Sequence, residues 1–305
     1  MNKLQARNSC LLFFAALIWG TAFVAQSVGM DYIEPFTFSA LRSLIGSAVL
    51  LPCIFMFRKK KKDDGRKKEE KKDLIKGGIV CGLVLCTAAN LQQVALMHAG
   101  VGKSGFLTAL YIVIVPLLGV FAGKRPGVKL CAAVVLAVAG LYLLCMKSGS
   151  LSLESWDVLL LFCSAAFALH IMVIDHFTQK ADGVKLSCVQ FLVCGVISLV
   201  LMLLFEHPSI PAIFDAWMPV LYVGVFSSGI AYTLQIVGQK GMNPVVASLI
   251  MSLESVISAI AGWMILGQTL SRREMAGCIV MFAAIVLAQL PEKKLNREQK
   301  PVKIG

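Results

Sequence analysis

The sequence has few charged residues for its length. Asp, Glu, Lys and Arg make up 15% of the 305 residues, whereas soluble domains contain about 25%. Hydrophobic residues make up 58%, and the mean hydropathy is +0.79. A single soluble core of this size cannot hide so much apolar surface. The shortage of charge therefore excludes an ordinary soluble domain.

The sequence also lacks the motifs of several common sites. Its ten cysteines include no Cys-x-x-Cys pair and fall almost entirely in apolar blocks, where Cys packs as a small hydrophobe. Residues 102–104 read Gly-Lys-Ser, but Met97 stands where a phosphate loop needs its first glycine. The sequence contains no His-Glu-x-x-His motif. We therefore expect no disulfide framework, no metal, no cofactor and no bound nucleotide.

The apolar residues fall in blocks of helical, membrane-spanning length. About 20 residues of helix cross the ~30 Å hydrocarbon layer, and backbone groups in lipid must bond within their own segment. The first block follows Lys3 and Arg7 as in a signal peptide, but no clean cleavage site follows it. We predict an all-α integral membrane protein with ten transmembrane helices, at residues 10–29, 35–57, 74–97, 101–122, 128–147, 156–177, 185–205, 215–238, 244–266 and 272–290.

The basic residues predict an orientation for these helices. The chain has a net charge of +12, and much of it lies in the stretch 58–73 and in the tail 291–305. With a cytoplasmic N-terminus, 24 Lys and Arg fall on the cytoplasmic side and 4 on the outer side. The positive-inside rule then predicts a multi-pass protein of the cell membrane with both termini in the cytoplasm.

The two halves of the chain share a weak sequence repeat. Residues 108–123 align with residues 251–267 at an offset of about 143. The alignment divides the chain into a first repeat at 10–147, which contains the basic loop 58–73, a second repeat at 156–290, and a basic tail at 291–305. Five helices in each repeat force the second into the opposite membrane orientation. Inverted repeats are typical of alternating-access transporters.

Three segments carry a resemblance to a known family: LIWGTAF at 17–23, LTALYIVIVPLLG at 107–119 and SLESVISAIAGW at 252–263. Together with Arg42, they resemble the EamA-type members of the drug/metabolite transporter superfamily. The resemblance implies two inverted five-helix repeats, a cavity lined mainly by the third, fourth, eighth and ninth helices, and export of amino acids, related metabolites or drugs. The turns at Gly123 and Gly267 are followed by Lys and Gln, where the family usually has Glu.

Two charged residues, Arg42 and Glu254, lie deep within predicted spans rather than near their ends. Glu254 is ten residues into the span 244–266, about 15 Å deep, and an ionised carboxylate there costs about 2.5–3.5 kcal/mol. We hypothesise that Glu254 lines the substrate path and carries a proton; the alternative is a structural carboxyl bonded to nearby serines. Arg42 lies about 12 Å below the outer surface. It attracts a carboxylate or phosphate of the substrate, or it is a structural charge partner.

Polar residues at helical spacing supply the other candidates. Asn90 and Gln93 are three residues apart and share a helix face, as do Tyr232 and Gln235. Such faces suit hydrogen bonds to a polar solute, but they also hold helices together. Tyr111 aligns with Glu254 across the repeat, which makes it a further candidate for the cavity.

These features favour a secondary transporter that exports small metabolites, such as amino acids or related compounds, or drugs by alternating access, with proton coupling through Glu254. A flippase for a lipid-linked sugar is the alternative within this class. A membrane-embedded enzyme or a receptor has less support. We expect a small-molecule substrate and the lipid bilayer as partners. No nucleic acid is expected, because the stretch 58–73 has no aromatic residue to stack on bases; nothing in the sequence indicates the oligomeric state.

The orientation is testable in a variant whose ten native cysteines are replaced. We expect single cysteines introduced in 58–73 and in 291–305 to react from the same side of the membrane with a thiol reagent that cannot cross it. Labelling of the two positions from opposite sides would contradict an even number of crossings between them.

Overall fold

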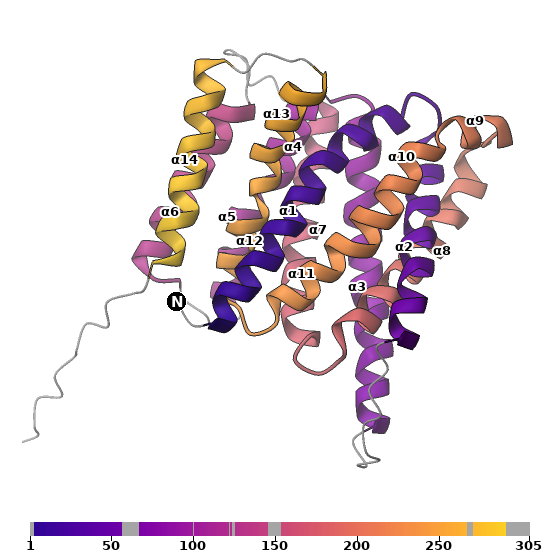
Figure 1. The fold of residues 1–305 in the computed structure, drawn as a ribbon, viewed down its shortest axis with the longest axis horizontal. Helices are drawn as coiled ribbons and strands as arrows, with labels where there is room; N and C mark the ends of the chain where they lie inside the picture. The colour runs from indigo at the N-terminus through magenta and orange to yellow at the C-terminus, as the bar shows by residue number, and fades with distance from the viewer. Residues whose placement is uncertain are drawn as a thin grey trace, which may run out of the picture.

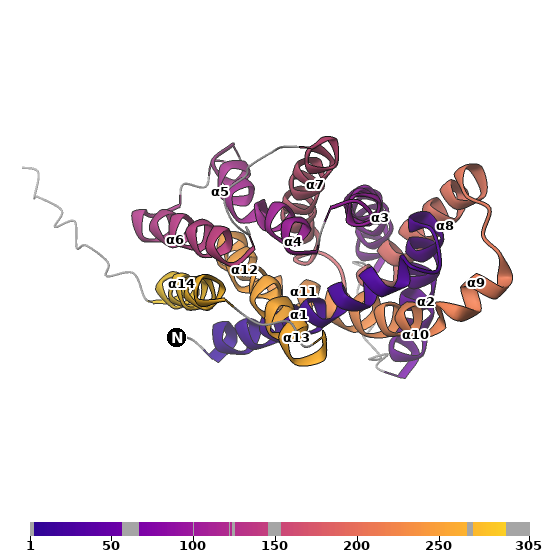
Figure 2. The same ribbon diagram turned by 90° about the horizontal axis from the view of Figure 1, so that it is seen from above.

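The computed structural model of the protein is helical throughout the residues that it describes, which are 3–56, 67–99, 101–121, 123, 126–145, 154–266 and 271–290. Its long helices run roughly alongside one another (Figure 1). Seen from above, α1, α12 and α13 lie near the middle, with the packed pair α6 and α14 on one side and the packed pair α2 and α8 on the other (Figure 2).

Residues 3–145 form the first half of the bundle. Its helices are α1 (Lys3–Gly29), α2 (Pro35–Met56), α3 (Lys67–Leu96), α4 (Val101–Ala109), α5 (Tyr111–Phe121) and α6 (Val128–Cys145). Helices α4 and α5 together make one crossing, so this half crosses the bundle five times.

Residues 154–290 form the second half. Its helices are α7 (Ser155–Phe177), α8 (Gly183–Phe205), the short α9 (Ile210–Asp215), α10 (Trp217–Tyr222), the π-helix η1 (Val223–Ala231), α11 (Tyr232–Gln239), α12 (Pro244–Met251), α13 (Leu253–Leu266) and α14 (Arg272–Gln289). The segment α10–η1–α11 makes one crossing and α12–α13 makes another. Five crossings precede α7, so the second half starts at the opposite end of the bundle.

The predicted fold of ten crossing helices is confirmed. Within the described residues, eight helical segments are long and apolar enough to span a membrane, and α6 has a shorter apolar stretch, Val128–Leu144. Helix α14 begins with three charged residues, Arg272, Arg273 and Glu274, and packs against α6. The first residues of α1 and the last residues of α14 lie at the same end of the bundle (Figure 1).

Two helices begin well before the apolar stretch that predicted them. Helix α1 begins at Lys3 rather than residue 10, and α3 begins at Lys67 rather than residue 74. Lys and Glu are good helix formers, and Glu69 and Glu70 in the first turn of α3 complement the helix dipole. The basic stretch 58–73, predicted as a loop, is therefore helical from Lys67 onward; its preceding part and the tail 291–305 lie outside the described residues.

Two spans that the sequence pattern predicted as continuous are interrupted in their middle. The first breaks at Leu110, between α4 and α5, and the second at Ser252, between α12 and α13. The Ser252 hydroxyl donates a 2.8 Å hydrogen bond to the carbonyl of Leu249, one turn earlier. Leu110 and Ser252 lie within one or two residues of the repeat offset, so the two halves break at matching points.

Apolar and polar side chains are distributed as expected for a protein surrounded by lipid. Large apolar side chains face outward, whereas the interior holds many hydroxyl, amide and imidazole groups. A polar group exposed to hydrocarbon has no partner, so it is more stable between helices. Exposed examples are Phe55, Phe121, Val135, Leu204 and Ile279, and buried ones are Ser43, Ser47, His170, Gln190 and Ser198.

One buried carboxylate joins two helices at the end of the bundle opposite the termini. Glu206 follows the last residue of α8, and its carboxylate accepts hydrogen bonds from the backbone N–H groups of Phe36 and Thr37 at 2.7 Å each. The Thr37 hydroxyl donates a third bond at 2.6 Å. Free N–H groups and the helix dipole at a helix N-terminus favour a negative charge. Glu206 thus caps α2 from the end of α8.

This cap yields a stability prediction. Replacing Glu206 with Ala leaves buried N–H groups of α2 unpaired, which we expect to cost about 1–3 kcal/mol and to lower the thermal unfolding temperature of the purified protein in detergent by several degrees. Glu34→Ala is the matched control, because Glu34 is an exposed carboxylate beside the same helix start. Equal unfolding temperatures for the two variants would contradict the capping role.

Candidate functional site

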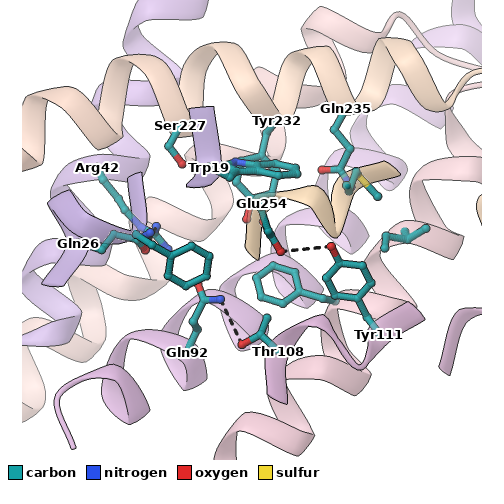
Figure 3. Close-up of a pocket in the computed structure, with 14 residues that line it drawn as sticks. Trp19, Gln26, Arg42, Gln92, Thr108, Tyr111, Ser227, Tyr232, Gln235 and Glu254 are labelled. Carbon is teal, nitrogen blue, oxygen red and sulfur yellow. Dashed lines mark hydrogen bonds between the residues drawn. The ribbon is translucent and has the colours of Figure 1, made fainter. Parts of the chain in front are cut away.

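A cavity lies between the two halves of the bundle, where the interrupted helices meet. The empty space in and in front of this cavity has a volume of about 500 Å³, a value that includes space open to the solvent. Its walls come from nearly all the helices around the middle of the bundle (Figure 3). The lining residues are Trp19, Phe23, Gln26, Arg42, Gln92, Thr108, Tyr111, Phe167, Ile171, Ser227, Tyr232, Gln235, Met251 and Glu254.

The helix breaks bring Tyr111 and Glu254 together. Tyr111 is the first residue of α5, and Glu254 is the second residue of α13, so each follows a break directly. The Tyr111 hydroxyl donates a 3.2 Å hydrogen bond to Oε1 of Glu254 (Figure 3). The two residues occupy matching positions of the repeat, so the pseudo-symmetry of the fold makes them neighbours in the cavity.

Glu254 is 8% exposed, and Tyr111 is its only hydrogen-bond partner among the described residues. No cation in the described part of the chain lies within ion-pair distance of it. An isolated carboxylate in such a place is costly. Two states avoid that cost, a protonated acid and a carboxylate balanced across the cavity by Arg42.

Arg42 lies at another part of the same cavity (Figure 3). Its side chain is 5% exposed, and Nη1 donates a 2.9 Å hydrogen bond to Oε1 of Gln26 on α1. The amide of Gln26 donates in turn to the carbonyl of Ala22 at 3.3 Å, which fixes its orientation. Arg42 and Glu254 line one cavity without pairing directly.

The π-helix η1 places Ser227 and Tyr232 in the cavity wall. It packs closely on α2: a Cβ added at Gly224 would lie 2.8 Å from Cβ of Ile45, and one added at Gly46 would lie 2.6 Å from Cβ of Ser228. Segments of π-helix often occur at functional sites, because they change the direction of the side chains that follow. Here Tyr232 is the first residue after η1.

Aromatic rings form part of the cavity wall. The rings of Trp19 and Tyr232 meet edge to face with their centres 4.8 Å apart, a favoured arrangement for aromatic pairs. The ring of Phe191 also packs edge to face against Tyr232, with the ring centres 5.2 Å apart. The Trp19 Nε1–H group and Oε1 of Gln235 are buried without a hydrogen-bond partner among the described residues. The wall therefore offers both apolar surface and unsatisfied polar atoms.

Five of the seven predicted site residues line the cavity: Arg42, Tyr111, Tyr232, Gln235 and Glu254. Asn90 faces α8 instead, where its amide donates a 2.9 Å hydrogen bond to the hydroxyl of Ser198. Gln93 is fully buried but does not line the cavity.

Other lining residues were absent from the set predicted as site residues. Gln92 occupies the cavity wall of α3, and its amide donates a 3.4 Å hydrogen bond to Thr108. Gln26 and Ser227 are polar residues inside predicted spans, and this is the one feature of the sequence that could have indicated a place in the cavity wall. Phe167 carries no such signal, because a ring in an apolar span is normal. Within the described residues, no group of three or more His, Cys, Asp or Glu is arranged to hold a metal ion.

Sequence comparison identifies the family. The profile of the EamA-like transporter family matches residues 7–146 and again residues 154–290. This chain belongs to the EamA-like transporter family. It is therefore a multi-pass membrane transporter rather than an enzyme, as predicted from the sequence.

Individual relatives are distant but align over most of their length. An uncharacterized transporter of Archaeoglobus fulgidus is 25% identical, over 92% of this chain and 84% of its own. The uncharacterized transporter YwfM of Bacillus subtilis is 24% identical, over 95% and 96%. The uncharacterized inner membrane transporter YedA of Escherichia coli is 23% identical, over 92% and 89%. A solved crystal structure, 19% identical, has the same fold, with a TM-score of 0.77 over 93% of this chain and 96% of its own.

The contact between Tyr111 and Glu254 yields a prediction about coupling. If the hydroxyl and the carboxyl stabilise each other, Tyr111→Phe and Glu254→Gln are not additive in thermal stability. We expect a coupling free energy of about 0.5–1.5 kcal/mol in a double-mutant cycle on the purified protein.

Tyr32→Phe, combined with Glu254→Gln, is the control cycle, because Tyr32 is exposed and lies outside the cavity. We expect its effects to add. Additive effects for Tyr111 as well would show that the contact contributes nothing to stability.

Proposed function

We propose that this transporter exports small metabolites, such as amino acids or related compounds, or drugs, by alternating access. The observation that carries the proposal is the cavity at the interface of the two repeats, where two interrupted helices meet through Tyr111 and Glu254. Transporters with inverted repeats bind their solutes at such interfaces, often at interrupted helices.

The helix breaks support a rocking motion of one repeat against the other. At Leu110 and Ser252 the regular α-helix is interrupted, and in our proposal each span bends at that point. The hydrogen bond between Tyr111 and Glu254 crosses the interface of the halves. In our proposal, this bond breaks and re-forms as the cavity opens alternately to the two sides.

The proposal includes proton coupling at Glu254. The carboxyl group is buried, and its only protein partner among the described residues is a hydroxyl group. It can therefore exchange a proton whenever water enters the cavity, without breaking an ion pair. Release of the proton on the side where the solute enters and uptake on the other side would drive export.

The proposed setting is the cell membrane, with both termini in the cytoplasm. The 24 to 4 distribution of Lys and Arg supports this orientation. We further propose that residues 10–147 and 156–290 are the two moving units, with 291–305 as a basic tail.

Flux into proteoliposomes tests the proposal directly. We expect vesicles containing the purified protein, but not empty vesicles, to exchange at least one labelled compound from a panel of amino acids and cationic drugs. A transmembrane pH gradient should drive its accumulation. In Glu254→Gln, we expect the rate to fall at least about tenfold, equivalent to about 1.4 kcal/mol in a barrier, and the response to the gradient to disappear.

Glu34→Gln is the matched control, because it removes a carboxylate far from the cavity, and it should transport at the wild-type rate. A wild-type rate and pH response in Glu254→Gln would remove the proton role. Transfer of a lipid-linked sugar between leaflets, with no flux of any soluble compound in the panel, would replace the proposal with the flippase alternative.

A further inference from the structure

The described residues leave the positive charge of Arg42 unpaired and most of its hydrogen-bond donors without a partner. A guanidinium group is charged at every physiological pH and has five N–H donors. Among the described residues, the only acceptor bonded to it is Oε1 of Gln26, which takes a bond from Nη1. Nε is fully buried and has no partner, and no acceptor in the described part of the chain bonds Nη2. An uncompensated charge in such a place is strongly unfavourable.

The unpaired atoms form one edge of the guanidinium. Nε and Nη2 hold two parallel N–H groups, and a carboxylate accepts both with its two oxygens. The remaining nitrogen, Nη1, is held by Gln26, whose own amide is held by Ala22. Figure 3 shows Arg42 and Gln26 together at one part of the cavity, away from Tyr111 and Gln235. The free edge is therefore fixed in orientation by its neighbours.

The second half of the protein makes the corresponding helix–helix contact with an uncharged amide. Arg42 is the eighth residue of α2, and Gln190 is the eighth residue of α8, the matching helix of the second repeat. Gln190 contacts His170 on the preceding helix at 3.1 Å, as Arg42 contacts Gln26. A neutral amide can thus join these two helices. The positive charge of Arg42 is an addition to the structural contact.

Glu254 does not remove the need for a negative group at Arg42. Among the described residues that line the cavity, Glu254 and Arg42 are the only ones of the types Asp, Glu, Lys, Arg and His. If Glu254 is protonated, the cavity has a net positive charge, which a solute anion can balance. If Glu254 is ionised, the cavity has separate positive and negative groups, and a solute with both charges fits between them. In either state, the negative group of a solute belongs at Arg42.

We propose that the free edge of Arg42, formed by Nε and Nη2, binds the carboxylate of the transported solute. The inference rests on the proposed function, in that it takes this cavity as the solute site. The transported compounds are then organic acids or zwitterions, and Arg42 is the residue that selects them against neutral and purely cationic compounds. The aromatic pair of Trp19 and Tyr232 in the same cavity suits an apolar body on that acid.

Binding to the purified full-length protein in detergent tests this inference without any transport step. The probes are pairs of aromatic and aliphatic carboxylic acids and their primary amides, amino acids and amino acid amides included, at millimolar concentrations. Thermal stabilisation of the protein reports binding. We expect several acids to bind and their amides to bind at least about tenfold more weakly, the effect of losing a charge-assisted hydrogen bond.

Three variants locate the selectivity. Arg42→Gln should lose the preference for acids over amides. Arg42→Lys should retain only part of it, because an ammonium group cannot form the two parallel bonds. Gln26→Glu leaves Arg42 and its contact with α1 in place but supplies a carboxylate from the protein. It should weaken acid binding at least about tenfold and leave amide binding unchanged, even if the Arg42 variants fold poorly.

Several results would overturn the inference. One is that no acid in the panel binds, or that the wild type binds acids and amides equally. Another is that Gln26→Glu keeps the wild-type preference for acids. A third is that millimolar chloride or phosphate alone displaces the acids, which would indicate an inorganic anion site. Proteoliposome flux of the acids at the wild-type rate in Arg42→Gln would overturn it while leaving the transporter proposal intact. Absence of flux for all compounds would count against the proposed function, whereas acid binding in detergent would still support the site.

Discussion

Hydrocarbon offers no hydrogen bonds, and this constraint governs the whole molecule. It requires each crossing segment to be helical, and it makes polar side chains favourable only between helices or along a wetted cavity. The same constraint explains where irregular backbone is found. The breaks at Leu110 and Ser252 and the π-helix η1 all lie beside the central cavity. Irregular backbone within a membrane is tolerated where it is buried in protein or lines a cavity.

The internal repeat brings the irregular segments of the two halves together at one cavity. Because the two halves are related by pseudo-symmetry, a break in one span has a counterpart in the other, and both face the same central space. The chemistry at the matching points then differs: one half contributes the hydroxyl of Tyr111 and the other the carboxyl of Glu254. The same is true of Arg42 and Gln190, one charged and one neutral at matching helix positions. The pseudo-symmetry of the fold places residues at corresponding positions, and the different side chains at those positions make the cavity polar.

The sequence predicted the fold well and the site in part. Span lengths, the inverted halves and the depth of Glu254 follow from hydropathy and helical rise, and these are local properties. Asn90 and Gln93 share one face of α3, but neither lines the cavity, and Asn90 bonds to Ser198 of α8 instead. Gln92, which lies between them in the sequence, does line the cavity. Adjacent residues of a helix point about 100° apart. Where polar and apolar residues both occur around the buried side of a helix, hydropathy alone does not predict how the helix is rotated about its axis. The sequence pattern also did not predict the helix breaks, because neither has a proline at the interruption.

The amino-acid sequence by itself determined that this chain is a membrane protein of two five-helix repeats, because the need to satisfy backbone groups in lipid is met segment by segment. It also determined that a carboxyl group lies near the middle of a span. Only the tertiary structure decided that Glu254 meets Tyr111, that Arg42 is held by Gln26 rather than paired with Glu254, and that one edge of its guanidinium is free. These are relations between side chains on different helices, and they depend on how each helix is rotated about its axis. That rotation is set by the packing of all the helices together.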